Sequence, residues 1–163
     1  MITLEQLLES RDNRAQHQRE LLGAHPGCSL ISFTVQLPGP EKRNEISLKI
    51  GKVGVQTIKA EFGPAIEHWE VRDLETGFEA YFVVSLDADQ TKRRCCAIED
   101  THPWGRLMDI DVPGTDRAAV GLPARKCLLC NNEVRYCMRA KLHTQEELLA
   151  KIYEIVRNPL QSA

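Results

Sequence analysis

Hydrophobic residues recur along this chain with two different periods, which together predict an α+β fold. Spacings of three and four residues predict helices over residues 3–24, 41–62, 88–100 and 144–157. Alternation of apolar and polar residues predicts strands over residues 30–37, 66–71, 78–86 and 108–112. The core order is therefore β-α-β-β-α-β, which is the ferredoxin-like arrangement. An N-terminal helix precedes this core, and a C-terminal helical extension that contains cysteines follows it.

Local signals set the expected ends of these elements. Thr3 with Gln6, and Thr144 with Glu147, have the spacing of a capping box at the start of a helix. We expect residues 117–122 to pair back as a hairpin strand, a helix near Tyr136, and frayed residues after Asn158-Pro159. Helices should cover one face of the sheet and leave the other face free for a site.

Two helices carry residues that do not suit a simple core-facing stripe. In the first helix, the apolar stripe of Leu4, Leu7, Leu8, Ala15, Leu21 and Leu22 is interrupted by Arg11 and Gln18. Either the interruption is a buried pair neutralised by Asp12 or Glu9, or it forms the wall of a polar cleft. In the second helix, Gly51 and Gly54 weaken the helix by roughly 1 kcal/mol each relative to alanine. They indicate close packing or approach to a ligand.

The strand near residue 110 carries the first candidate site. Met108, Ile110 and Val112 alternate with Asp109 and Asp111, so both carboxylates leave the same side, with Cα atoms about 6.6 Å apart. Two like charges at that separation favour a bound cation, and oxygen ligands suit Mg²⁺. Upstream, Gly105 would permit a close backbone approach and Arg106 would grip a phosphate. The alternative is a hairpin whose outer face carries two solvated aspartates.

A second candidate site lies in the cysteine-rich segment. Cys127 and Cys130 form a Cys-x-x-Cys pair, and Cys137 and His143 follow them; these four residues suffice for a structural, tetrahedral zinc site. The alternative is that these cysteines are small buried hydrophobic residues, as we expect for Cys28, Cys95 and Cys96.

Size and charge narrow the class of protein. At 163 residues, one domain spanning residues 1–163 is expected, and a net charge of −2 indicates no nucleic-acid or membrane partner. No apolar run is long enough for a membrane span, and the N-terminus lacks the features of a signal peptide. We therefore expect a cytoplasmic protein whose six cysteines are thiols or metal ligands. Residues 123–143 hold five basic residues and one Glu, which suits an anionic ligand or an acidic partner.

Several segments, in order along nearly the whole chain, resemble the family of apo-citrate lyase phosphoribosyl-dephospho-CoA transferases, the CitX family. The matching segments are residues 10–14 with Gln18, residues 25–26, 32–35 and 38–40, residues 102–112, residues 125–130 and residues 137–139. The resemblance implies transfer of phosphoribosyl-dephospho-CoA from triphosphoribosyl-dephospho-CoA to a serine of the citrate lyase acyl carrier subunit. A phosphodiester forms and diphosphate leaves.

The resemblance also implies roles for particular residues. Asp109 and Asp111 would hold Mg²⁺, and Arg106 would bind phosphate oxygens. Arg11, Arg14 and Gln18 would form a second substrate-binding wall, and His102 would orient the attacking hydroxyl or a phosphate. The basic segment, residues 123–143, would dock the acidic carrier.

Three other functions remain open for this sequence. They are a non-catalytic zinc-knuckle interaction module, a phosphohydrolase, and a related transferase acting on a malonate decarboxylase carrier.

Overall fold

The computed structural model describes residues 1–158, and the elements follow the predicted order. They are α1 (Leu4–Ala24), β1 (Ser29–Val35), α2 (Glu45–Phe62), β2 (Ile66–Leu74), β3 (Gly77–Val84), α3 (Ala88–Thr101), β4 (Asp109–Asp111), α4 (Val134–Ala140) and α5 (Gln145–Arg157). Three short 3-10 helices, η1 (Gly63–Ala65), η2 (Gly105–Leu107) and η3 (Ala118–Val120), connect them. The predicted fraying after Asn158 concerns residues outside the described range.

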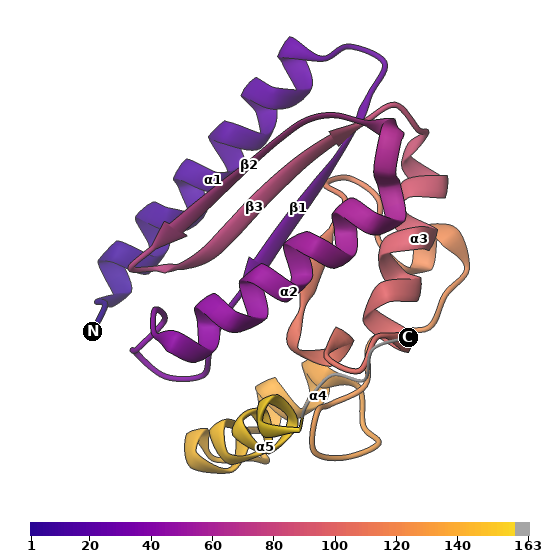
Figure 1. The fold of residues 1–163 in the computed structure, drawn as a ribbon. Coiled ribbons are helices and arrows are strands. Elements are labelled where there is room, and N and C mark those ends of the chain that lie inside the picture. The colour runs from indigo at the N-terminus through magenta and orange to yellow at the C-terminus, as the bar shows by residue number, and fades with distance from the viewer. Residues whose placement is uncertain (159–163) are drawn as a thin grey trace.

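The four strands form one sheet in the order β2-β3-β1-β4, and every neighbouring pair is antiparallel (Figure 1). The register places Ser32 opposite Asp111 and Thr34 opposite Asp109 on β4. Because side chains alternate along a strand, these four residues share one face, and Phe33 and Ile110 share the other.

The face that carries Phe33 is the apolar face. It packs against α2 and α3, with Ile152 and Val156 of α5 completing the same core. A Cβ atom at Gly51 or Gly54 would collide with the ring of Phe78 or of Phe33, respectively. The two glycines of α2 therefore serve close packing against the sheet, which is one of the two interpretations that the sequence allowed.

The opposite face is covered by α1, so the prediction of one free face is wrong (Figure 1). The predicted apolar stripe of α1 is also largely wrong, since Leu4 and Leu8 are 71% and 48% exposed. Leu21 is the hydrophobic residue of α1 that is fully buried, against Leu30, Tyr81 and Val83. The face that α1 covers is rich in polar residues, and α1 therefore turns polar side chains toward it.

The segment after β4 differs from the prediction in one element. Residues 117–122 do not form a hairpin strand but contain η3. Asp116 accepts a hydrogen bond from the backbone N–H of Ala119 (2.8 Å), and Gly121 ends the turn with a left-handed φ of 74°. This hydrogen bond and the left-handed conformation of Gly121 close a turn, so the chain does not continue as a strand. The helix at Tyr136 is confirmed as α4, and Thr144 caps α5 by accepting from the N–H of Glu147 (3.1 Å).

The two edge strands of the sheet are unlike. The edge strand β2 has nine residues, whereas β4 has three. The N–H of Ile110, on the outer side of β4, donates to the buried carboxylate of Glu99 (3.0 Å). Within residues 1–158, no helix is both long enough and apolar enough to cross a membrane.

Candidate functional site at the edge of the sheet

Asp109 and Asp111 project from the same side of β4, as the alternation predicted. Both carboxylates are exposed, and both line a cavity of about 330 Å³ at the edge of the sheet. Burial by neighbouring atoms and the charge of Asp109 raise the pKa of Asp111, although the ammonium of Lys92 opposes this shift. The charge of Asp109 thus disfavours the charged form of Asp111.

Cations surround the carboxylate pair. The Nζ atom of Lys92, which is 6% exposed on α3, lies 3.8 Å from Oδ1 of Asp111. Arg117 and Arg125 line the same cavity. A site with carboxylates on one wall and guanidinium groups on another can hold a cation and the phosphate oxygens bound to it.

Buried Glu99 fixes the two arginines. Its carboxylate accepts from Nη2 of Arg117 (2.9 Å) and lies 3.2 Å from Nη1 of Arg125. Arg125 also donates to the carbonyl groups of Met108 (2.9 Å) and Gly105 (3.2 Å). Because Glu99 also binds the backbone of Ile110, one carboxylate ties α3, β4 and the loop before α4 together.

Sequence reasoning missed Lys92, Glu99, Arg117 and Arg125. A signal for two of them was present, since Lys92 and Glu99 are seven residues apart and therefore share a face of α3 with Cys95 and Cys96. Charged residues within an apolar helical stripe indicate a polar contact inside the fold. Arg117 gave no such signal, because its partners lie in a different element.

Polar residues of α1 contact different strands on the face of the sheet that α1 covers. Gln18 donates to the hydroxyl of Ser32 (3.0 Å), which is opposite Asp111 in the register. Arg14 instead lies beside buried Glu79, with Nε 3.6 Å from Oε2, and lines another cavity. The buried-pair interpretation concerned Arg11 and Gln18, and of these Gln18 pairs with Ser32 rather than with Asp12 or Glu9. The carboxylate partner of Arg14, buried Glu79, was not predicted.

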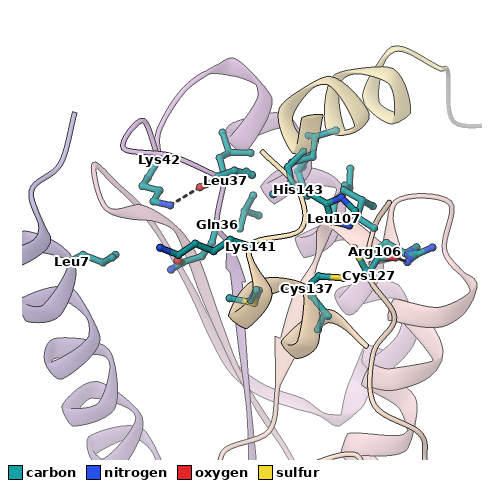
Figure 2. Close-up of a pocket in the computed structure, with 18 of the residues that line it drawn as sticks. Leu7, Gln36, Leu37, Lys42, Arg106, Leu107, Cys127, Cys137, Lys141 and His143 are labelled. Atoms are coloured by element: carbon teal, nitrogen blue, oxygen red, sulfur yellow. Dashed lines mark hydrogen bonds between the residues drawn. The ribbon is translucent and has the colours of Figure 1, made fainter. Parts of the chain in front are cut away.

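Arg11 and Arg106 line a larger cavity of about 650 Å³ at the end of β1 (Figure 2). Leu7 of α1 lies at one side of it, and Cys127, Cys137 and His143 of the cysteine-rich segment lie at the other. Arg106 also donates to the carbonyl oxygens of Lys126 and Cys127. Val134 lines both this cavity and the one that contains Asp109 and Asp111, so the two cavities adjoin.

His102 and Gly105 do not join the carboxylate pair. Nδ1 of His102 accepts from the N–H of Trp104 (2.9 Å), and Nε2 lies 3.4 Å from the hydroxyl of Thr57 on α2. Burial lowers the pKa of His102, which agrees with a neutral ring at this junction. Gly105 lies against the carbonyl groups of Ile98 and Glu99 at the end of α3, where a Cβ atom would not fit. Both residues therefore shape the turn before β4.

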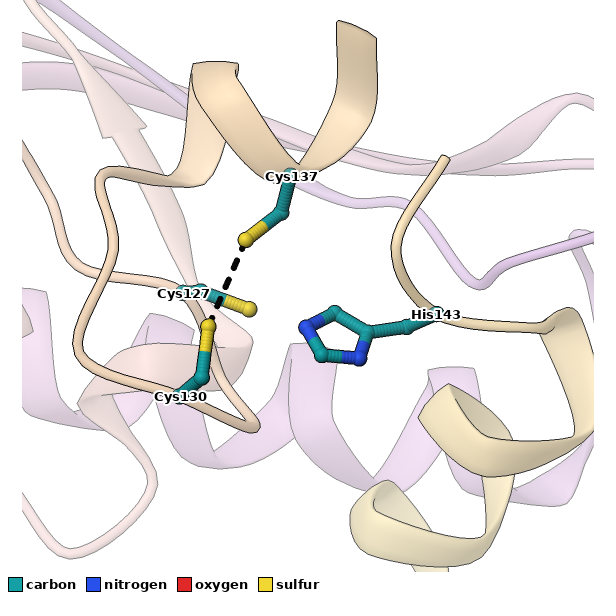
Figure 3. Close-up of side chains that lie close together, drawn as sticks. All are labelled: Cys127, Cys130, Cys137 and His143. Atoms are coloured by element: carbon teal, nitrogen blue, oxygen red, sulfur yellow. Dashed lines mark hydrogen bonds between the residues drawn. The ribbon is translucent and has the colours of Figure 1, made fainter. Parts of the chain in front are cut away.

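The cysteine-rich segment brings its four predicted ligands together. Donor atoms of Cys127, Cys130, Cys137 and His143 all lie within 4.8 Å of one another, and the ring of His143 points toward the three sulfur atoms (Figure 3). The Sγ atoms of Cys130 and Cys137 are 3.4 Å apart. Chain segments before α4, within α4 and before α5 each contribute, so the cluster links parts that share few apolar contacts.

The polar atoms of this cluster suit a metal ion. Nε2 of His143 is buried and has no hydrogen-bond partner among residues 1–158, while Nδ1 lies 3.7 Å from Oε2 of Glu147. A carboxylate beside the second ring nitrogen is the usual support of a metal-bound histidine. A hydrogen bond from the backbone of Asn132 is the largest of the contacts that lower the pKa of Cys130 to about 6, which favours the thiolate that metals bind.

Comparisons with known proteins agree with the resemblance noted in the sequence. The family model of the apo-citrate lyase phosphoribosyl-dephospho-CoA transferases, CitX, matches residues 2–159. A probable transferase of this name from Vibrio cholerae serotype O1 (strain M66-2) is 36% identical over 96% of this chain and 93% of that protein. One from Escherichia coli O6:K15:H31 is 34% identical over 96% and 90% of the two chains. A probable one from Streptococcus pyogenes serotype M18 is 31% identical over 96% and 86%. The chain belongs to the apo-citrate lyase phosphoribosyl-dephospho-CoA transferase family.

Proposed function

We propose that this protein transfers phosphoribosyl-dephospho-CoA from triphosphoribosyl-dephospho-CoA to a serine of the citrate lyase acyl carrier subunit. The names of the family and of the relatives contain phosphoribosyl-dephospho-CoA and apo-citrate lyase, which supports this prosthetic group and this acceptor enzyme. The observation that carries the proposal is the pair of Asp109 and Asp111, facing one cavity together with Arg117 and Arg125. Phosphoryl transfer needs this combination, because its main demands are charge neutralisation and alignment.

Asp109 and Asp111 fit a magnesium ion, since they are exposed, share one face of β4, and the charge of Asp109 helps to raise the pKa of Asp111. When bound, Mg²⁺ would neutralise phosphate oxygens and stabilise the diphosphate leaving group. Lys92 limits the repulsion within the pair, and Glu99 holds Arg117 and Arg125 in place.

In the proposed reaction, the serine oxygen bonds to the α-phosphorus of the triphosphate as the bond between that phosphorus and the bridging oxygen breaks. The bonding electrons leave with diphosphate, and the serine releases its proton. Arg117 and Arg125 line the cavity of the carboxylate pair, where the charge of the leaving diphosphate would develop. Arg106 and Arg11 lie in the adjoining cavity, where they can bind other phosphate groups of the donor. His102 is not assigned a role, because it lines neither cavity.

We also propose that Cys127, Cys130, Cys137 and His143 bind a structural zinc ion. Four ligands leave no open position for catalysis, and the buried, unpartnered Nε2 of His143 supports binding. Metal analysis of the purified protein should give one zinc per chain. Cys130→Ser should lower this content, whereas Cys28→Ser, which alters a cysteine outside the cluster, should not. A folded wild-type protein that contains no zinc would contradict the assignment.

The proposal extends to the fold and to the protein's surroundings. The strand order β2-β3-β1-β4 with antiparallel neighbours, and α2 and α3 on one face, support a ferredoxin-like core within a single domain. We also propose that the protein acts in the cytoplasm, without a nucleic-acid or membrane partner.

Mass spectrometry of the acceptor tests the proposed reaction. The purified citrate lyase carrier subunit should gain one phosphoribosyl-dephospho-CoA group on a serine after incubation with the enzyme, Mg²⁺ and the donor. A carrier in which that serine is replaced by alanine should remain unmodified. An unmodified wild-type carrier would refute the proposal, and efficient modification of a malonate decarboxylase carrier alone would assign the enzyme to that related reaction.

A further inference from the structure

The 650 Å³ cavity at the end of β1 combines aliphatic side chains, which we call its floor, with side chains that carry charges of one sign, which we call its rim. Figure 2 labels Lys42, Arg106 and Lys141 of the rim. Its rim contains Arg11, Lys42, Arg106 and Lys141, and no Asp or Glu from residues 1–158 lines it. Its floor is formed by aliphatic side chains, namely Leu7, Val35, Leu37, Ile50, Leu107, Leu128, Val134, Leu148 and Ile152. A ligand that fits both parts must combine negative charge with an extended apolar portion.

The charges of the rim lack carboxylate partners. In the part of the chain that the structure describes, none of the four side chains takes part in an ion pair. The ammonium of Lys42 donates to the carbonyl group of Leu37 (2.5 Å), and burial and the charge of Arg11 lower its pKa. The charge of Arg11 thus disfavours the charged form of Lys42, and a bound anion would remove this cost.

The position of the cavity relates it to the carboxylate pair. Thr34 is opposite Asp109, and Gln36, two residues further along the chain, lines the cavity. Val134 is shared by the two cavities. Because the two cavities share Val134, an elongated molecule that reached past this residue would have its polyphosphate at Asp109 and Asp111 and its remaining part along the apolar floor.

We infer that this cavity binds the dephospho-CoA portion of the donor, an assignment that rests on the proposed function. The rim would bind the diphosphate that joins adenosine to pantetheine, and the floor would bind the pantetheine arm. The cavity volume lies within the usual range for small-molecule sites, about 300–1,000 Å³. An acidic carrier surface would use the rim but not the floor, where Val35 and Ile50 are 1% exposed.

Calorimetric titration of dephospho-CoA into the full-length protein tests this assignment without any transfer reaction. Met138 lines the cavity but is 72% exposed, so Met138→Glu adds a negative charge there with little effect on packing. We expect the dissociation constant to rise about tenfold. Lys42→Met, which keeps the length of the side chain and removes its charge, should have a similar effect.

Matched controls separate charge from shape and from catalysis. Met138→Gln, and Tyr136→Glu on the same helix but outside the cavity, should bind dephospho-CoA within about threefold of wild type. Asp109→Asn should retain this binding even if it abolishes transfer. Undetectable binding to wild type, or unchanged binding in both Met138→Glu and Lys42→Met, would overturn the assignment and leave the proposed reaction intact. Unchanged dephospho-CoA binding together with weakened carrier binding would assign the rim to the carrier instead.

Discussion

The two faces of the sheet differ in what their side chains do, although both are made from the same strands. On β1, Ile31, Phe33 and Val35 are at most 1% exposed and pack beneath α2 and α3. Between them, Ser32 and Thr34 face α1 and are also buried, at 3% and 5% exposed. Their neighbours on this face are Asp109 and Asp111.

This difference teaches that burial alone does not identify a structural core. The apolar face gains stability from the removal of hydrocarbon from water. The polar face holds hydrogen-bonded and charged groups in fixed positions, as a site for an anionic substrate requires. Substitutions on the two faces should therefore change different measured quantities.

The largest expected effect is on stability and distinguishes neighbouring residues of β1. Phe33→Ala should lower the free energy of unfolding by about 3–5 kcal/mol, because it leaves a cavity against Gly54. Thr34→Val keeps the shape of the side chain but removes its hydroxyl from the face that α1 covers. It should lower the free energy of unfolding by less than about 1 kcal/mol. Urea denaturation followed by circular dichroism measures both values, and equal losses would refute the division between the faces.

The next effect is on the reaction rather than on stability. Asp109→Asn and Asp111→Asn should each lower the transfer rate by about 10²–10³-fold, because they remove charge that the phosphates and their cation require. Asp109 is exposed, so the free energy of unfolding should change by less than about 0.5 kcal/mol in Asp109→Asn. Asp111→Asn also removes the charge beside buried Lys92, so its cost in stability should be larger than that of Asp109→Asn. Initial rates of carrier modification and denaturation curves test this, and full activity in both variants would remove the carboxylates from the site.

A smaller effect is expected where α1 contacts β3. Arg14→Met leaves the carboxylate of Glu79 without its cation and should lower the free energy of unfolding by about 1–3 kcal/mol. Since Arg14 lines a cavity separate from that of Asp109, the KM for the donor should not change. A raised KM at unchanged stability would restore the substrate-binding role that the sequence resemblance implied.

The smallest effect concerns pH. Because burial lowers the pKa of His102 in the folded state, the protonated ring favours the unfolded chain. The stability that the neutral ring contributes is fully present at pH values above the pKa of His102 in the unfolded chain. It is lost as the pH falls through the lowered pKa of His102 in the folded state. His102→Asn, which can still accept from the N–H of Trp104, should therefore show a smaller decrease in Tm between pH 7 and pH 5. An identical decrease would indicate that His102 is not buried in its neutral form.

The sequence predicted best what depends on neighbours along the chain. The alternation around Phe33 and Ile110 gave the strands, and Thr3 and Thr144 gave the helix starts, since these signals act over a few residues. It failed for α1, because the residues that Arg14 and Gln18 meet, Glu79 and Ser32, are contributed by distant strands.

The two candidate sites show the same limit. The period of two placed Asp109 and Asp111 on one face, but the buried carboxylate of Glu99 and its contacts to Arg117 and Arg125 depend on how α3 packs. The spacing of Cys127, Cys130, Cys137 and His143 matched a zinc site only loosely. The chain nevertheless brings them together, because α4 and the turn at Lys141, with its left-handed φ of 50°, reverse its direction.

The contact between Glu99 and the backbone of Ile110 has a consequence for how copies of this protein meet in solution. An unpaired strand edge is a template for adding another chain, and the carboxylate occupies one of its few donors on β4. The nine-residue edge at β2 has no equivalent cover within the described residues, and Trp69 and Val71 there are 45% and 41% exposed. Self-association at high concentration should therefore begin at β2, at the edge of the sheet away from Asp109 and Asp111.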